Sequence, residues 1–378
     1  MILTQCAICA TELGLSLGKK CGRCSTRYCG AECQKQHWEQ GGHDQLCKKI
    51  KKAGGAEQYN ANKKYAEAVG AAAEACADDV KGQTCYICTQ ALHWKTKEGL
   101  VRMCACRGTA GFAHVSCLVE QAKILMDEVE ENNLGDKVGH ERFRRWQTCS
   151  LCKQNYHGVV QCALGWGCWK MYSGRPEGHT TRTAAMNLLG NGLSDADHDE
   201  DALSVREAEL SMLRRLGAPE EILLVVQGNI GNSYQFLGRL EESLSVRQDV
   251  YSGFLKLKGE EDHDTLREAN NYAHCLLTLR KCKEAKSLLR KTISVTRRAR
   301  REGEENTLRL RWNYARALSE DDGATLDDLR EAVTTFEEIE RIARRVLGGA
   351  HPIVAGIEDN LRNARAALRA RETPPRSA

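Results

Sequence analysis

Cysteine is distributed very unevenly along this 378-residue chain. Seventeen of the 19 cysteines precede residue 169, and only Cys275 and Cys282 follow it. The first residues lack the basic start and apolar core of a signal peptide, and no apolar run approaches the ~20 residues that cross a bilayer. We therefore expect a soluble protein of the cytoplasm or nucleus, where thiols stay reduced and clustered cysteines bind metals rather than form disulfides.

The first cysteine cluster holds eight potential metal ligands in four pairs. A C-x2-C pair forms a tight turn that presents both sulfurs to one ion, and a pair four residues apart shares one face of a helix. Eight ligands suffice for two tetrahedral zinc sites. The pairs are Cys6/Cys9, Cys21/Cys24, Cys29/Cys33 and His43/Cys47.

The sequence CQKQHW, which begins at Cys33 and is followed by His43 and Cys47, resembles a MYND zinc finger over residues 6–47. In that family the pairs alternate between two zinc ions. In this sequence His43 is the expected histidine ligand, and His37 is the alternative. The resemblance also implies binding of short, often proline-containing peptides. It implies one zinc on Cys6, Cys9, Cys29 and Cys33 and a second on Cys21, Cys24, His43 and Cys47.

A second set of eight ligands comes next along the chain, in the order four cysteines, one histidine and three cysteines. Each of these cysteines has a partner at ligand spacing, and a metal-bound thiolate is not free to react. Structural zinc is therefore favoured over a catalytic or redox cysteine. The eight are Cys85, Cys88, Cys104, Cys106, His114, Cys117, Cys149 and Cys152.

The C-x-C spacing and the phrase CACRGTAGFAHVSCL resemble a RING-CH finger rather than a plant-homeodomain finger. The resemblance implies a ubiquitin ligase that positions a ubiquitin-charged conjugating enzyme. Ile87, Trp146 and Lys153 match the family's contacts with that enzyme and with ubiquitin, and core packing or solvated charge is the alternative for each. Trp94 is a second candidate beside Trp146 for the family's tryptophan. The implied zinc ligands are Cys85, Cys88, His114 and Cys117 for one ion and Cys104, Cys106, Cys149 and Cys152 for the other.

The C-terminal half of the chain repeats with a period of 42 residues, and its apolar residues fall at helical intervals. Each repeat is therefore a helix pair that must stack on its neighbours. The pattern resembles kinesin-light-chain-type tetratricopeptide repeats over about 200–368, which implies a groove for peptides or proteins. Asn229, Asn271 and Asn313 recur at one position and are predicted either to hold a peptide backbone or to hydrogen-bond between helices.

The apolar segment 155–172 is predicted to form a helix that packs the fingers onto the C-terminal half of the chain. A fifth metal site made by His157, Cys162 and Cys168 is the alternative. The predicted fold class is two small zinc-stabilised, cross-braced fingers followed by an all-α helical repeat solenoid. The predicted parts are a MYND-type finger (1–52), a helical linker (53–80), a RING-CH-type finger (81–157), an apolar connecting segment (158–179), TPR-like repeats (180–370) and a disordered tail (371–378).

The formal net charge of +4 comes from 55 basic and 51 acidic residues, so the charge balance gives no case for nucleic acid. No nucleotide-binding loop or hydrolase triad is present. We predict four zinc ions and a ligase whose repeats and MYND finger select protein substrates. The alternative is a non-catalytic scaffold, and a chromatin-reading finger is less favoured because the C-x-C spacing is wrong for it.

Overall fold

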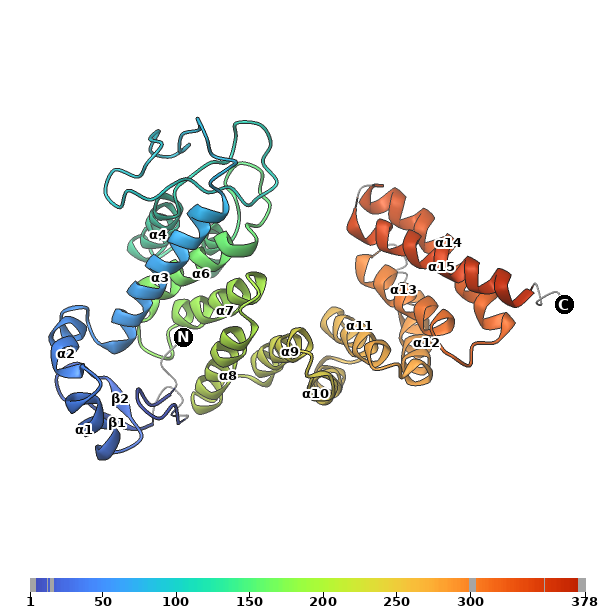
Figure 1. Cartoon of the computed structure of the whole chain (residues 1–378). Helices are drawn as coiled ribbons and strands as arrows, with labels where there is room; N and C mark the ends of the chain where they lie inside the picture. Colours follow the sequence, from blue (N-terminus) through green and yellow to red (C-terminus); the bar gives the residue numbers. More distant parts are fainter. Residues whose placement is uncertain (1–4, 12, 14–16, 299–303, 350, 373–378) are drawn as a thin grey trace, which may run out of the picture. The chain divides into compact units, whose positions relative to one another are not determined.

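The structure is a computed structural model that describes residues 5–11, 13, 17–298, 304–349 and 351–372. Its internal packing divides the chain into two compact units, residues 1–218 and 219–378. The fold class is the predicted one: cysteine-rich zinc-binding modules are followed by an all-α array of TPR-like helical repeats (Figure 1). The domain boundaries expected from the sequence stay a prediction, and residues 373–378 of the expected tail lie outside the described part.

The first unit begins with a small finger whose apolar core is thin. Its buried residues other than cysteine include Leu13, Tyr28 and Ile50, and the cysteines fill most of the remaining interior. The two strands are antiparallel, with Lys19 opposite Tyr28. The elements are β1 (Lys19–Lys20), β2 (Arg27–Tyr28), α1 (Ala31–Glu39) and α2 (His43–Lys52).

The rest of the first unit is built around one helix, α6 (Gly158–Tyr172), which has eleven buried residues among its fifteen. A helix that is apolar on all sides is stable in water only when it is enclosed. Helices α3, α4 and α7 pack against it, and the helix predicted over 155–172 is formed from Gly158 onward. The surrounding elements are α3 (Ala56–Ala75), α4 (Val115–Glu131), α5 (Asp136–Phe143), η1 (Arg144–Trp146), α7 (Thr180–Asp195) and α8 (Asp199–Arg215).

Two glycines allow α6 and α7 to approach backbone to backbone. A Cβ atom on Gly192 would lie 2.7 Å from the carbonyl oxygen of Gln161, and one on Gly165 would lie 3.1 Å from the Cα of Leu189. The first distance is shorter than real Cβ atoms show, and the second is tighter than most, so a larger residue at either position requires the helices to shift. This close contact fixes α7 to the zinc-binding part of the first unit.

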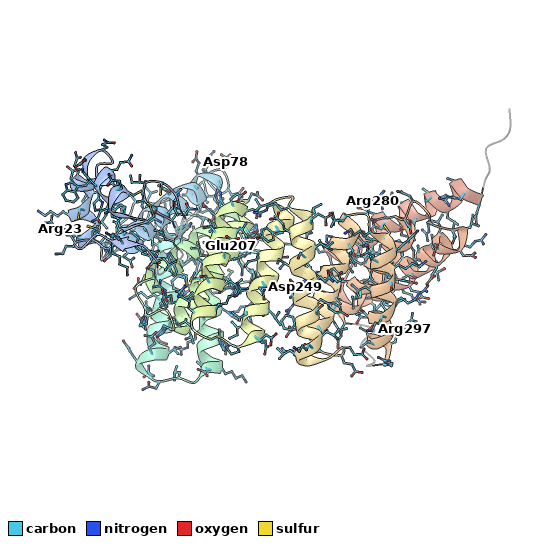
Figure 2. All side chains as sticks on the ribbon, turned by 90° about the horizontal axis from the view of Figure 1, so that it is seen from below. Arg23, Asp78, Glu207, Asp249, Arg280 and Arg297 are labelled. Atoms are coloured by element: carbon cyan, nitrogen blue, oxygen red, sulfur yellow. The ribbon has the colours of Figure 1, made fainter. Side chains whose placement is uncertain are left out.

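The second unit consists of helix pairs that stack side by side, with charged residues such as Asp249 and Arg280 projecting from their outer surfaces (Figures 1 and 2). Each pair buries an apolar stripe against its neighbour, as a repeat must. Among the described residues, no helix of the chain is both long and apolar enough to span a membrane. The helices are α9 (Glu220–Phe236), α10 (Leu240–Lys258), α11 (His263–Thr278), α12 (Cys282–Arg298), α13 (Glu305–Ser319), α14 (Leu326–Leu347) and α15 (Pro352–Glu372).

A buried ion pair joins three of these helices. Arg247 on α10 lies 3.3 Å from a carboxylate oxygen of Glu268 on α11, and their side chains are 2% and 6% exposed. The same guanidinium donates a hydrogen bond to the Asn232 side chain on α9. Burial lowers the pKa of Arg247, and the carboxylate of Glu268 offsets part of that effect. The register of neighbouring helices therefore depends on this arginine being paired.

Glu268→Ala should destabilise the second unit by about 3 kcal/mol, because it leaves the Arg247 guanidinium buried without a counter-ion. Hydrogen exchange of the amides of α10 and α11 should accelerate on the order of 100-fold. The control is Glu260→Ala, which breaks a pair with Arg298 whose side chains are 45% and 61% exposed. That variant should cost less than about 1 kcal/mol. Equal effects of the two substitutions would contradict a structural role for the buried pair.

Candidate metal centres

Four groups of four side chains converge in the first unit, and they are the four quartets that the interleaved pairing implies. In each group the ligand atoms all lie within 4.8 Å of one another. We call them sites A to D. Site A is Cys6, Cys9, Cys29 and Cys33; site B is Cys21, Cys24, His43 and Cys47; site C is Cys85, Cys88, His114 and Cys117; site D is Cys104, Cys106, Cys149 and Cys152.

The distances between ligand atoms fit a tetrahedral zinc ion. The Sγ atoms of Cys9 and Cys29 are 3.4 Å apart, and those of Cys106 and Cys149 are 3.7 Å apart. A tetrahedron with zinc–sulfur bonds of ~2.3 Å has edges of ~3.8 Å, whereas the sulfurs of a disulfide are ~2.05 Å apart. Sets of four cysteines, or of three cysteines and one histidine, are those of structural zinc. The chain therefore binds Zn2+ through these clusters.

All four C-x2-C pairs are held by the same backbone turn. In the Cys85 turn, the amide of Thr89 donates to the carbonyl of Cys85 over 2.8 Å, and the amide of Cys85 donates to the carbonyl of Gln90 over 3.0 Å. The residue after the second cysteine has a positive φ, although none of the four is glycine. This conformation costs about 1 kcal/mol per residue, far less than the ~10–16 kcal/mol that a structural zinc contributes. The four residues are Ala10, Ser25, Thr89 and Lys153.

Site B contains His43 rather than His37. The Nε2 atom of His43 lies 3.3 Å from the Sγ of Cys24. His37 packs against it with ring centroids 4.9 Å apart, but its Nδ1 atom hydrogen-bonds to the hydroxyl of Tyr28 over 2.9 Å. Burial lowers the pKa of both imidazoles, which favours the neutral form that a metal requires. His37 thus supports the site from outside the ligand group.

His114 in site C is oriented by both of its ring nitrogens. Its Nδ1 atom lies 3.3 Å from the Sγ of Cys88, and its Nε2 atom is 3.3 Å from the carbonyl oxygen of Ala91. Donation from Nε2 to that carbonyl leaves the Nδ1 lone pair free for the metal. Burial lowers the pKa of His114 as well.

The thiols of site A differ in how readily they ionise. The hydrogen bond with the Thr11 hydroxyl lowers the pKa of Cys9 to about 6, whereas the hydrogen bond with Cys29 raises the pKa of Cys33 to about 12. Like charges this close disfavour one another, so the four sulfurs become thiolates together only around a cation. Zinc supplies that charge when it is bound.

The predicted contact residues of the second finger lie in three different environments. Ile87 is half-buried and lines an open groove of about 470 Å³ between the metal-binding turns and α4. Lys153 is exposed, and its ammonium donates to the carbonyl of Ser150, which also lines the groove. Trp146 is 0% exposed and packs against Tyr172, so the prediction that it contacts a partner is wrong. Its large apolar ring packs in the hydrophobic core around α6.

The aromatic side of this groove is Trp94, which is 68% exposed. It sits on a turn with the same hydrogen bonds as the metal-binding turns: the amide of Lys97 donates to the carbonyl of His93, and the amide of His93 donates to the carbonyl of Glu98. The amide of Thr96 donates to the His93 ring, and this hydrogen bond closes the turn where the other turns have metal ligands. Because the turn lacks cysteine, no ligand spacing in the sequence revealed it.

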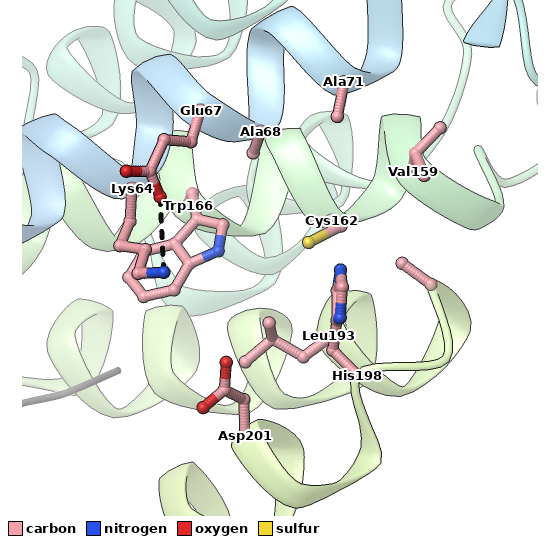
Figure 3. Close-up of a pocket in the computed structure, with 11 residues that line it drawn as sticks. Lys64, Glu67, Ala68, Ala71, Val159, Cys162, Trp166, Leu193, His198 and Asp201 are labelled. Carbon is pink, nitrogen blue, oxygen red and sulfur yellow. Dashed lines mark ion pairs between the residues drawn. The ribbon is translucent and has the colours of Figure 1, made fainter.

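The alternative fifth metal site is not formed. Among the described residues, His157, Cys162 and Cys168 do not belong to any group of converging ligands. Cys162 instead faces a small pocket of about 220 Å³ together with Trp166 and His198 (Figure 3). Burial raises the pKa of Cys162 to about 11, so this thiol stays protonated and is a poor nucleophile.

The three repeated asparagines do not share one role. Asn313 is buried, and its amide donates to the side chain of Asn270 over 2.9 Å, so the helix-to-helix alternative holds for Asn313 and a groove role does not. Asn271 donates to Glu268 within its own helix over 3.2 Å. Asn229 is half-buried on α9. The shared sequence position therefore does not give these residues a common partner.

Comparisons with known proteins identify one family, over the first finger. Residues 6–47 match the family model of the MYND finger. No curated protein matches the chain. Among solved structures, kinesin-light-chain TPR-like repeats from Podosopora anserina align over 61% of this chain and 97% of that one, with 16% identity and a TM-score of 0.42. BtubC from P. vanneervenii aligns over 70% and 96%, with 12% identity and a TM-score of 0.38. A Rap protein in complex with competence and sporulation factor aligns over 68% and 71%, with 12% identity and a TM-score of 0.39.

Substitution of the two histidines of the first finger separates a ligand from a supporting residue. We expect His43→Ala to lose one zinc ion, because site B then retains only three ligand atoms. His37→Ala should keep the full zinc content, since it removes the hydrogen bond with Tyr28 and the ring contact with His43 but no ligand atom. Native mass spectrometry of the intact proteins measures the stoichiometry directly. Loss of an ion from His37→Ala but not from His43→Ala would reverse the assignment.

Proposed function

We propose that the second finger is a RING-CH-type ubiquitin ligase module, and that the repeats and the MYND finger select the protein substrates. A MYND finger and TPR-like repeats together are typical of a protein-interaction scaffold. In the proposed function the second finger also promotes a reaction, by positioning the charged conjugating enzyme. The proposal assigns one zinc ion to each of sites A to D and places the protein in the cytoplasm or nucleus, where its thiols stay reduced.

The groove of the second finger is the observation that carries this proposal. Ile87 comes from a metal-binding turn, Trp94 from the metal-free turn, and Ile124 from α4, where it is 48% exposed. Three apolar side chains on separate elements form a patch that water solvates poorly. Such patches are sites of protein association, and aromatic residues contribute strongly to their binding energy. In the proposed RING-type interaction, a conjugating enzyme presents an apolar surface that is complementary to this patch.

Charged and polar groups border this apolar patch. Glu120 and Arg145 line the groove, and the ammonium of Lys153 is held at its edge by the carbonyl of Ser150, 2.6 Å away. Groups at a rim contribute mainly to orientation and to the choice of partner. Lys153 is therefore suited to contact the ubiquitin that the enzyme carries, while the apolar patch holds the enzyme.

The chemistry itself needs no nucleophile from the finger. The amine of a substrate lysine attacks the thioester carbonyl of the charged enzyme, an amide bond forms, and the enzyme's cysteine leaves as the thiol. Holding the thioester and the amine together converts an encounter between two proteins into a step within one complex. Each site offers four protein ligands, so a zinc ion bound there would have no open position for substrate and would support the surface.

A non-catalytic scaffold is the second candidate. The exposure of Trp94 and Ile124 favours a bound protein at the groove but does not by itself require that protein to carry ubiquitin. In a scaffold the three modules bind separate proteins and bring them together. Only a transfer assay separates the two functions.

The test is a reconstituted ubiquitination reaction with the zinc-loaded chain and a panel of conjugating enzymes. Ile87→Ala and Trp94→Ala should each reduce chain formation at least tenfold, because each removes an apolar contact worth about 1.5 kcal/mol or more. Val138→Ala is the matched control, since Val138 is an exposed apolar residue on α5 that does not line the groove.

Zinc content and circular dichroism of all variants should equal those of the wild type, so that a loss of activity reports the surface and not the fold. Absence of ubiquitin transfer by the wild-type chain with every enzyme, at full zinc content, would refute the ligase and leave the scaffold.

A further inference from the structure

The second unit contains a cavity of about 560 Å³ between α12 and α14, with α13 as its floor. This volume lies within the range of small-ligand and side-chain pockets. The cavity belongs to the second helices of two neighbouring repeats, whereas Asn229 and Asn271 lie on first helices. Asn313 lies on the floor helix α13, but it is buried against Asn270, and none of the three repeated asparagines lines the cavity.

The two walls of the cavity carry opposite charges and are joined by an ion pair at one end. There, the ammonium of Lys286 on α12 pairs with Asp328 on α14. Further along α12 the wall presents Arg290 and Arg297, and α14 presents Glu331 and Glu338. Arg311 and Tyr314 of α13 line the cavity between these two walls.

The floor residues engage both carboxylates. Arg311 is 8% exposed and pairs with Glu338, so these two charges cancel. The hydroxyl of Tyr314 donates to Glu331 over 2.8 Å and accepts from Arg290 over 3.2 Å. Tyr314 thereby holds the Arg290 guanidinium in place through one nitrogen and leaves its other N–H groups available.

Arg297 is the cation of this cavity that lacks a partner. It is exposed at the end of α12 (Figure 2), and within the described ranges no acidic side chain pairs with it. The cavity thus holds three guanidinium groups against two carboxylates, and two of the three guanidinium groups have free donors.

We propose that this cavity binds the phosphate of a phosphorylated serine or threonine in a partner protein. A phosphate monoester carries about two negative charges at neutral pH and three acceptor oxygens, which match two guanidinium groups better than a singly charged carboxylate does. The planar fork of arginine suits such an anion. The volume admits the phosphorylated side chain and part of its neighbours. This proposal does not depend on whether the second finger is a ligase.

The experiment uses the full zinc-loaded chain, immobilised, and two degenerate peptide libraries that differ only in a central phosphothreonine or threonine. The phosphorylated library should be retained at least tenfold more strongly. Phenyl phosphate tests whether a small phosphate ester is the ligand instead of a phosphorylated protein. It should compete only at a much higher concentration than the retained peptides. Equal retention of both libraries would refute the proposal.

Amino-acid substitutions distinguish binding in the cavity from non-specific attraction of phosphopeptides to positive charge on the surface. Arg290→Ala with Arg297→Ala should abolish the preference for phosphothreonine, and Ser294→Trp should do so by filling the cavity without removing a charge. Arg369→Ala is the matched control, because Arg369 is an exposed arginine on α15 that does not line the cavity. An equal loss in the Arg369 variant, or an unchanged preference in the Ser294 variant, would show that the peptides bind elsewhere.

Discussion

Coordination of metal by thiolates and imidazoles is the interaction on which the first unit depends. The first finger has few buried apolar side chains besides its cysteines, so hydrophobic burial alone cannot compensate the ordering of its loops. Each structural zinc ion contributes on the order of 10–16 kcal/mol, which is comparable to the stability of a whole domain. The left-handed residues that close the four turns are tolerated because the metal holds both cysteines of each turn.

Parts of the chain that are more distant in sequence from the first finger depend less on metal and more on hydrophobic packing. The second finger shares its apolar core with α3, α4 and α6, so the metal and the hydrophobic effect act together there. The repeats of the second unit contain no metal group in their described residues and rely on stacked apolar stripes and on the buried pair of Arg247 and Glu268. The two units therefore differ in what unfolds them: removal of zinc acts on the first, and loss of helix packing acts on the second.

The sequence was sufficient where local spacing determines structure. Metal ligands must sit at fixed separations along the chain, so the spacing and the family resemblance together predicted the quartets that converge, and the helical period predicted the repeats. The interior arginine pair was missed because Arg247 and Glu268 look like ordinary charges on a helix surface. Asn313 was ambiguous for a related reason, since a repeated polar residue can face either a groove or the neighbouring helix.

The error at Trp146 has a different physical origin. A tryptophan close to a zinc ligand can lie on the surface or in the core, and only the tertiary packing around α6 decides between them. Trp94, the second candidate, is the exposed ring, and its turn has the backbone hydrogen bonds of a metal-binding turn without the metal ligands. Sequence patterns based on cysteine cannot detect such a copy.

The dependence of the first unit on zinc is tested most directly by hydrogen exchange of the full chain before and after chelation, with the metal content followed by mass spectrometry. Residues around sites A to D should lose their protection once zinc is removed, while α9 to α15 should keep theirs. Native-like protection around these sites in a metal-free chain would contradict the claim that zinc coordination holds the first unit together.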